Sequence, residues 1–222
     1  MDAPPLPRSV RLDPRREQDQ AEANRRLIGV VVADFDRAWN LLRAERCDFT
    51  RRTFIRTTFA AIEAMVWELK QSIVIDVQAG RTECTHAELA MLRETGYALD
   101  RSGRVQGEKL RLPFMSNLKF ALKTYAKRYR QTELLDFGGP GFQALDRSRQ
   151  VRDRLTHPKS DEQLAVTDRE VEDAYEAFQW FFQTTNGILK AEVARLEALH
   201  KQLKRETAAA QANKTTSTPP SP

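Results

Sequence analysis

The sequence predicts an all-α protein, an antiparallel bundle of helices with a small hairpin or loop insertion. Apolar residues recur at three- and four-residue intervals through most of the chain, which is the spacing that lines one face of a helix. Turn-forming residues gather instead in two short segments, 99–105 and 138–141. The sequence has no internal repeat of solenoid period, so we expect one packed bundle.

Composition narrows the class of protein. With 222 residues the chain is long enough to bury a core in one domain without metal or disulfide staples. Lys plus Arg exceed Asp plus Glu by 36 to 31, and the net charge of +5 favours a polyanionic partner only mildly. The two cysteines show neither metal-ligand spacing nor a disulfide framework, and no apolar run suits a secretory signal or a membrane span. We therefore expect a soluble, cytoplasmic protein.

The two ends of the chain differ in composition from its middle. Residues 1–22 include a Pro-rich stretch and are expected to form a disordered arm. Residues 206–222, rich in Ala, Gln, Thr, Ser and Pro, are expected to form a disordered tail. The helical domain then spans 23–205, with an insertion at about 78–112.

Two long helices are expected at the start of this domain. A one-sided apolar stripe begins near Leu27 and runs to Leu42. The second helix, over about 50–77, has the wide stripe of a helix at a bundle centre. Glu63 and Trp67 lie beside that stripe, where a structural acid and a core aromatic are the favoured interpretations, and Glu63 is a secondary site candidate.

The insertion is expected to begin with a short helix. Thr85, followed three residues later by Glu88, forms a capping box that predicts a helix over about 86–95. The segment 99–105 then has Asp, Ser and Gly where a chain reversal needs them. A small hairpin or an ordered loop is therefore predicted there.

A helix expected over about 113–129 carries many basic residues interleaved with aromatic ones. This combination suits an RNA surface, because phosphates attract Lys and Arg while unpaired bases stack on aromatic rings. Ordinary amphipathicity explains the same pattern, with the aromatics in the core and the lysines in water. Both interpretations stay open. On the first, the RNA-binding residues are Lys119, Lys123 and Lys127.

The last third of the domain contains a glycine-rich connection and two helices. The segment 138–141 is expected to be a flexible hinge, since it lacks the lysine and hydroxyl of a phosphate loop. A helix over 142–156 follows, and a second capping box, Thr167 with Glu170, opens the last and longest helix. The apolar stripe of that helix continues to Leu203, further than a monomeric bundle needs, which predicts a homodimer.

The end of the 142–156 helix concentrates chemically useful side chains. Arg152, Asp153 and His157 lie within one and a half helical turns, and Pro158 follows at once. Arginine is a permanent forked cation that matches phosphate oxygens, and histidine exchanges protons near neutral pH. Asp153 and His157 share a helix face, so the carboxylate is expected to orient the imidazole. Pro158 disfavours helical geometry at His157 and predicts that the helix ends there.

This pattern, an arginine followed five residues later by a histidine with Asp directly after the arginine, resembles the signature of the HEPN superfamily. Members are compact helical bundles, many of them metal-independent ribonucleases acting as toxins or in antiviral defence. The resemblance implies catalytic roles for Arg152, holding the phosphoryl charge, for His157, exchanging protons with RNA, and for Asp153, orienting His157. It implies that Arg154 and Lys159 help to bind the RNA backbone. It also implies that no cofactor is needed.

The bare spacing is not specific, because Arg81 precedes His86 and Arg195 precedes His200 by the same interval. Context favours the copy at 152–157, which alone combines the acidic second residue with a helix-ending proline. The partners implied are RNA, a second copy of the chain that completes a shared cleft, and an antitoxin or activator protein. The alternative function is a HEPN-like module that binds RNA, nucleotide or protein without cutting, and a purely structural helical dimer is a further alternative.

Overall fold

The computed structural model describes residues 14–216 and is mostly helical, which confirms the predicted all-α class. A single two-stranded sheet lies among the helices of this described part. The main elements in chain order are α1 (Pro14–Ala44), α2 (Asp48–Gln78), α3 (His86–Arg93), β1 (Thr95–Leu99), β2 (Val105–Lys109), α4 (Phe114–Tyr129), α5 (Pro140–Thr156) and α6 (Asp168–Thr216). Two single turns of 3-10 helix, η1 (Thr132–Leu134) and η2 (Glu162–Leu164), lie in the connections on either side of α5.

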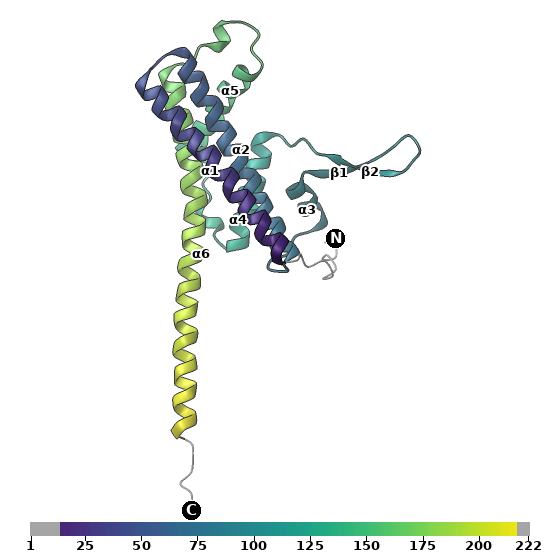
Figure 1. Ribbon diagram of the computed structural model, residues 1–222, viewed down its shortest axis with the longest axis vertical. Helices are drawn as coiled ribbons and strands as arrows, with labels where there is room; N and C mark the ends of the chain where they lie inside the picture. The colour runs from purple at the N-terminus through teal and green to yellow at the C-terminus, as the bar shows by residue number, and fades with distance from the viewer. Residues whose placement is uncertain (1–13, 217–222) are drawn as a thin grey trace, which may run out of the picture.

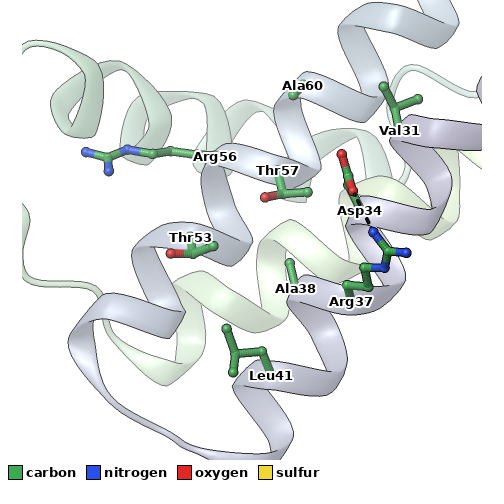
Figure 2. Close-up of a pocket in the computed structure, with 9 residues that line it drawn as sticks. All are labelled: Val31, Asp34, Arg37, Ala38, Leu41, Thr53, Arg56, Thr57 and Ala60. Carbon is green, nitrogen blue, oxygen red and sulfur yellow. Dashed lines mark ion pairs between the residues drawn. The ribbon is translucent and has the colours of Figure 1, made fainter. Parts of the chain in front are cut away.

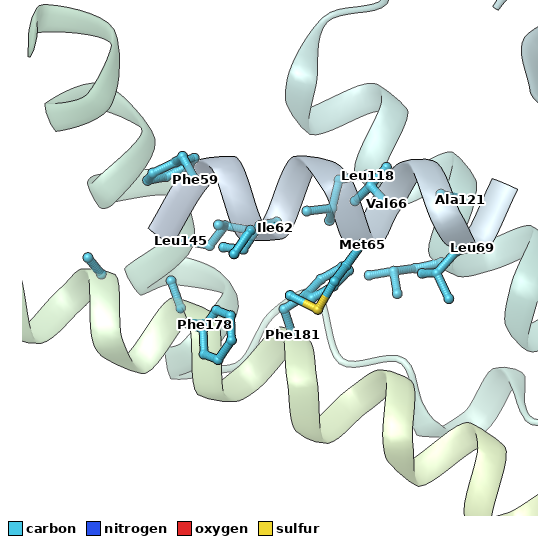
Figure 3. Close-up of a cluster of buried hydrophobic side chains, with 14 of the residues drawn as sticks. Phe59, Ile62, Met65, Val66, Leu69, Leu118, Ala121, Leu145, Phe178 and Phe181 are labelled. Atoms are coloured by element: carbon cyan, nitrogen blue, oxygen red, sulfur yellow. The ribbon is translucent and has the colours of Figure 1, made fainter. Parts of the chain in front are cut away.

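Helix α2 forms the centre of the bundle, as its wide apolar stripe predicts. Its buried side chains contact α4, α5 and α6, and Figure 3 shows this cluster between the helices. Residues spaced three and four apart fall on the same helix faces, so α2 can serve several neighbours at once. The cluster includes Phe59, Ile62, Met65 and Leu69 of α2 together with Leu118, Leu145, Phe178 and Phe181.

Helix α1 joins the bundle through aromatic contacts as well as through its long seam with α2. The ring of Phe35 stacks on Phe178 of α6 with centroids 3.7 Å apart. One turn further along α1, Trp39 stacks on Tyr175 with centroids 4.6 Å apart. These contacts tie the first helix of the chain to the last, so the bundle is closed by residues far apart in sequence.

Two buried charges on α2 hold the neighbouring elements. The side chain of Lys70 is fully buried, and its Nζ lies 2.9 Å from Oε1 of Glu94 and 2.8 Å from Oδ1 of Asn117. Glu94 caps the end of α3 with left-handed backbone geometry, and Asn117 belongs to α4. Asp76, also buried, pairs with Arg128 of α4. Both networks fix α4 against α2.

The predicted hairpin is present and projects sideways from the bundle, as Figure 1 shows. Its strands pair antiparallel, with Tyr97 opposite Gly107. Asp100 closes the turn, because its Oδ1 accepts hydrogen bonds from the backbone N–H groups of Ser102 at 2.8 Å and Arg104 at 2.9 Å. The Asp, Ser and Gly of this segment therefore act as the sequence predicts.

The N-terminal helix starts earlier than expected. The arm was predicted to extend to residue 22, but α1 begins at Pro14, and residues 1–13 lie outside the described part. Side-chain pairs one turn apart account for the difference, since Gln18 donates to Glu22 at 3.2 Å and Arg26 pairs with Glu22. Such pairs stabilise a helix without any apolar stripe.

The glycine-rich connection and the tail also differ from their predictions. Helix α5 begins at Pro140, and Gly141 is buried against Trp180, where an added Cβ would stand 2.7 Å from Cγ of the indole. The segment is thus a packed helix start and not a hinge. Helix α6 continues to Thr216 through residues expected to be disordered from 206, because that stretch is rich in Ala, the best helix former. Residues 217–222 lie outside the described part.

Only the first half of α6 belongs to the bundle. Ile188 and Glu192 are buried, and every residue from Val193 to Thr207 is exposed. Figure 1 shows this second half running on alone below the other helices. The connection from α5 to α6, which follows the Arg152–His157 motif, lies at the opposite end of α6, at the top of that view.

Candidate functional site at the end of α5

The motif is positioned by the last turn of α5. Val151 and Leu155 are buried and hold that turn against the bundle, which leaves Arg152 and Asp153 toward solvent. The helix ends at His157, whose backbone has left helical geometry with φ −130° and ψ 58°. Its N–H still donates to the carbonyl of Asp153 at 3.1 Å. The helix end predicted from Pro158 is therefore confirmed.

Arg152 is the centre of an ion-pair network. Its Nη2 contacts the carboxylate of Glu63 on α2, and its Nη1 lies 3.2 Å from Oδ1 of Asp153. The other carboxylate oxygen of Asp153 accepts a bond of 2.8 Å from Nη1 of Arg149. A guanidinium has five N–H donors, so these contacts leave Arg152 with donors for a phosphate. The network joins α2 to α5 at the level of the motif.

The expected orientation of His157 by Asp153 does not occur in this geometry. Both oxygens of the Asp153 carboxylate bond to arginines, Arg149 and Arg152, and the His157 side chain is exposed. The helical i, i+4 geometry that would bring carboxylate and imidazole together is lost, because His157 leaves the helix before Pro158. Guanidinium groups are also strong, charged donors to a carboxylate. Asp153 therefore orients arginines, and the prediction for its partner was wrong.

Glu63 has a perturbed carboxyl group. Partial burial raises its pKa above the ordinary value, and the positive charge of Arg152 opposes that rise. The nearby carboxylate of Asp153 adds to it. Glu63 thus shares its electrostatic environment with the motif, although it lies 89 residues before Arg152 in the sequence. Trp67, expected in the core, is 37% exposed.

The residues expected to bind the RNA backbone near the motif separate into two groups. Arg154 is turned inward, where its Nη1 donates to the carbonyls of Gln163 and Ala165 at 2.8 Å each and its Nη2 contacts Glu170 at 2.6 Å. It therefore holds the α5–α6 connection in place. Lys159 is exposed within that connection and is available to a ligand.

The basic residues of α4 lie away from the motif. Lys119 stands over the ring of Phe142 at 4.9 Å, near the first turn of α5, and Lys123 lies 5.9 Å from the ring of Phe137. Lys127 is exposed and pairs loosely with Glu88 at 3.9 Å. From Phe142 to His157 the helix rises about 22 Å. The structure therefore does not bring these lysines together with the Arg152–His157 motif.

Arg56 connects the motif to a shallow groove between α1 and α2. Its Nη2 donates to the carbonyl of Leu155 at 3.0 Å, at the end of α5. The same side chain lines the groove shown in Figure 2, with Thr53 and Thr57 on α2 and Leu41 on α1. The groove is mostly apolar, whereas the motif is charged, so Arg56 marks the boundary between two different surfaces.

Sequence reasoning missed three contributors to this site, Arg56, Glu63 as a partner of Arg152, and Arg149. Arg149 could have been identified from the sequence, because it lies one turn before Asp153 on the same helix. The contribution of Arg56 and the pairing of Glu63 with Arg152 have no local signal, because only the packing of α2 on α5 brings these residues to the motif. The other two histidines lie elsewhere: His86 opens α3, and His200 lies on the free half of α6.

Comparison with protein-family models, with curated proteins and with solved structures finds no match to this chain. Among residues 14–216, no group of three or more His, Cys, Asp or Glu side chains is arranged to hold a metal ion. No helix within the same range is both long and apolar enough to cross a bilayer. The class of protein therefore rests on the fold, a helical bundle with a charged motif at one helix end.

Proposed function

We propose that the protein is a metal-independent endoribonuclease of HEPN type, acting as a toxin or a defence effector, with a site completed by a second copy of the chain. The observation that carries the proposal is the exposed His157 where α5 ends, five residues after Arg152 of the same helix. An exposed imidazole can exchange protons with a substrate, and a guanidinium can hold a phosphate. Cleavage of a phosphodiester requires both of these functions.

The reaction would proceed within the RNA strand. His157 accepts the proton of a ribose 2′-hydroxyl as that oxygen attacks the adjacent phosphorus, and the bond from phosphorus to the 5′-oxygen breaks. The corresponding histidine of the second copy donates a proton to the departing 5′-oxygen. The products are a 2′,3′-cyclic phosphate and a 5′-hydroxyl, and no oxidant or metal enters the balance. Arg152 stabilises the negative charge that builds on the phosphoryl oxygens.

The ion pairs of Arg152 supply a second candidate function. Glu63 and Asp153 already compensate its charge, and Asp153 does not contact the imidazole. That arrangement also suits a HEPN-like module that binds RNA, a nucleotide or a protein without cutting. In such a module the network would stabilise the end of α5, and His157 would be an exposed surface residue.

Incubation of purified protein with mixed RNA in EDTA separates the two candidates. We expect cleavage by the wild type and its loss in His157→Ala, by about 100-fold or more, because a positioned acid or base contributes about that much. His86→Ala is the matched control, since His86 is also exposed and also follows an arginine by five residues. RNA affinity, measured by fluorescence anisotropy, should persist in His157→Ala.

The remaining outcomes are informative. Cleavage that survives in His157→Ala removes this residue from the mechanism and refutes the nuclease proposal as stated. Binding of RNA without cleavage by any form supports the binding module. Thermal unfolding of each variant shows whether a loss of activity comes from the site or from the fold.

A further inference from the structure

From Phe182 onward, α6 carries an exposed apolar stripe that begins at the edge of the bundle and continues along the free half of the helix. Its members are between 42% and 52% exposed, far more than a core residue. Isolated single leucines on a surface are ordinary, but a continuous row along a projecting helix marks an interaction surface. The row comprises Phe182, Leu189, Val193, Leu196 and Leu203, and the exposed Leu199 lies beside it.

The row follows a heptad pattern. Phe182, Leu189, Leu196 and Leu203 recur at intervals of seven residues. Midway between them, four residues after each of the first three, lie Asn186, Val193 and His200. In coiled-coil notation the first set occupies the d positions and the second set the a positions. Three of the four d residues are leucine, and the a residues include the β-branched Val193 and the amide Asn186, a combination that favours two strands.

We propose that α6 pairs with α6 of a second copy of this chain as a parallel, in-register, two-stranded coiled coil from Phe182 to Leu203. That segment is about 32 Å long. It covers three heptad intervals, the shortest length at which such a pattern is informative. The coil begins on the edge of the bundle and extends along the half of α6 that projects alone in Figure 1.

The two polar residues at the a positions, Asn186 and His200, favour a second copy in parallel orientation. In a parallel pair Asn186 faces its own equivalent and His200 faces its own equivalent, so each polar group meets a polar group. In an antiparallel pair with normal a-to-d packing, Asn186 would face Leu203 and His200 would face Leu189. Twofold symmetry would double these mismatches. A buried amide that faces leucine has no hydrogen-bond partner, and this is costly.

Charges beside the stripe favour the opposite orientation but more weakly. An antiparallel pair would bring Lys190 near Glu197 of the partner subunit, whereas a parallel pair brings Glu192 near that residue. The repulsion in the parallel pair is reduced, because Arg195 binds both carboxylate oxygens of Glu192, at 2.7 and 2.8 Å. Exposed ion pairs contribute little in water, so the matching of the buried layers decides the orientation.

The coil concerns a different part of the molecule from the proposed ribonuclease site and does not depend on RNA cleavage. The Arg152–His157 motif lies near the start of α6, and the coil begins at Phe182 and extends into the second half of that helix. A parallel pair nevertheless holds both bundles at the same end of the coil, so the two motifs stand at the same level. An antiparallel pair would put them at opposite ends.

Light scattering after size-exclusion chromatography tests whether the chain dimerises through this row of α6. We expect the wild type at twice the 25.5 kDa of one chain and the variant Leu196→Glu/Leu203→Glu at the mass of one chain. Both leucines lie beyond Glu192, the last buried residue among those described, so the bundle should still unfold cooperatively on heating. The control Ala194→Glu/Ala198→Glu adds the same charge on the opposite side of α6 and should remain dimeric. A monomeric wild type, or a Leu196→Glu/Leu203→Glu variant that stays dimeric, would overturn the proposal.

Cysteine cross-linking tests the orientation. In a Cys47→Ser/Cys84→Ser background, Leu203→Cys should form an interchain disulfide on mild oxidation, because a parallel pair places both copies of this residue in one layer. Ala198→Cys, on the outer side of the coil, should not. If a disulfide forms only between Leu203→Cys of one copy and Asn186→Cys of the other, the helices are antiparallel and the parallel arrangement is refuted.

Discussion

Substitution of Glu94 by glycine gives the sharpest test of how buried charge stabilises this bundle. Glu94 has a backbone φ of 52°, in the left-handed region that glycine adopts without cost. Relief of that strain is worth about 1 to 2 kcal/mol, and glycine returns about 0.4 to 1 kcal/mol of this through its greater freedom in the unfolded chain. On backbone grounds alone, Glu94→Gly should stabilise the protein slightly.

The side chain of Glu94 predicts the opposite and larger effect. Its carboxylate pairs with the fully buried ammonium of Lys70, whose pKa is lowered by burial, at 2.9 Å. Removing one partner of a buried pair costs about 3 to 5 kcal/mol, because the other charge is left without compensation. Asn117 alone remains to bond the ammonium. We therefore expect Glu94→Gly to lower the free energy of unfolding by about 2 to 4 kcal/mol.

Urea unfolding followed by circular dichroism measures this change. Arg130→Gly is the matched control, since Arg130 ends α4 with φ 57° and is exposed. It should be neutral or gain up to about 1 kcal/mol. In a Lys70→Met background, where no buried charge remains, Glu94→Gly should cost much less. Equal stability of Glu94→Gly and the wild type would refute the reasoning.

Two further predictions concern packing and acid stability. Gly141→Ala should destabilise the protein by about 1 to 3 kcal/mol, because the added methyl collides with Trp180 at the start of α5. Gly187→Ala, with open space around it, should instead stabilise α6 by about 1 kcal/mol. Thermal unfolding compares the two variants, and equal effects would contradict the packing argument. Arg147 donates two hydrogen bonds to Asp173 and holds the pKa of that carboxyl below its ordinary value. The ion pair therefore stabilises the fold fully at pH values above the ordinary pKa of Asp, and this contribution is lost as the pH falls through the lowered pKa of Asp173. Asp173→Asn should therefore lower stability at about pH 7 and have little effect at about pH 2, as urea unfolding at both would show, and an equal loss at both would refute the ionic origin.

The helices of the bundle could be predicted from local patterns. The stripe of α2, the capping boxes at Thr85 and Thr167, and the turn at Asp100 all correspond to the observed elements. Each of these signals depends on residues within a few positions of one another, so no tertiary information is needed to interpret them. The boundaries were less accurate at the two ends, where α1 begins at Pro14 and α6 runs to Thr216.

Aspects of the candidate site that depend on distant residues could not be predicted. The spacing of Arg152 and His157 and the helix end at Pro158 were evident in the sequence. The partner of Asp153 was not, because a carboxylate bonds to whichever strong donor the packed helices bring near, and here those donors are arginines.

The amino-acid sequence by itself determined the helical class, the order of the helices, the hairpin, the motif at the end of α5 and the heptad row on α6. All of these follow from the period of side chains along a helix and from local turn chemistry. The tertiary structure alone decided that Glu63 of α2 meets Arg152, that Arg154 turns inward, and that the lysines of α4 lie away from His157. The physical reason is that packing of long helices around one core, and not spacing in the sequence, sets which faces meet.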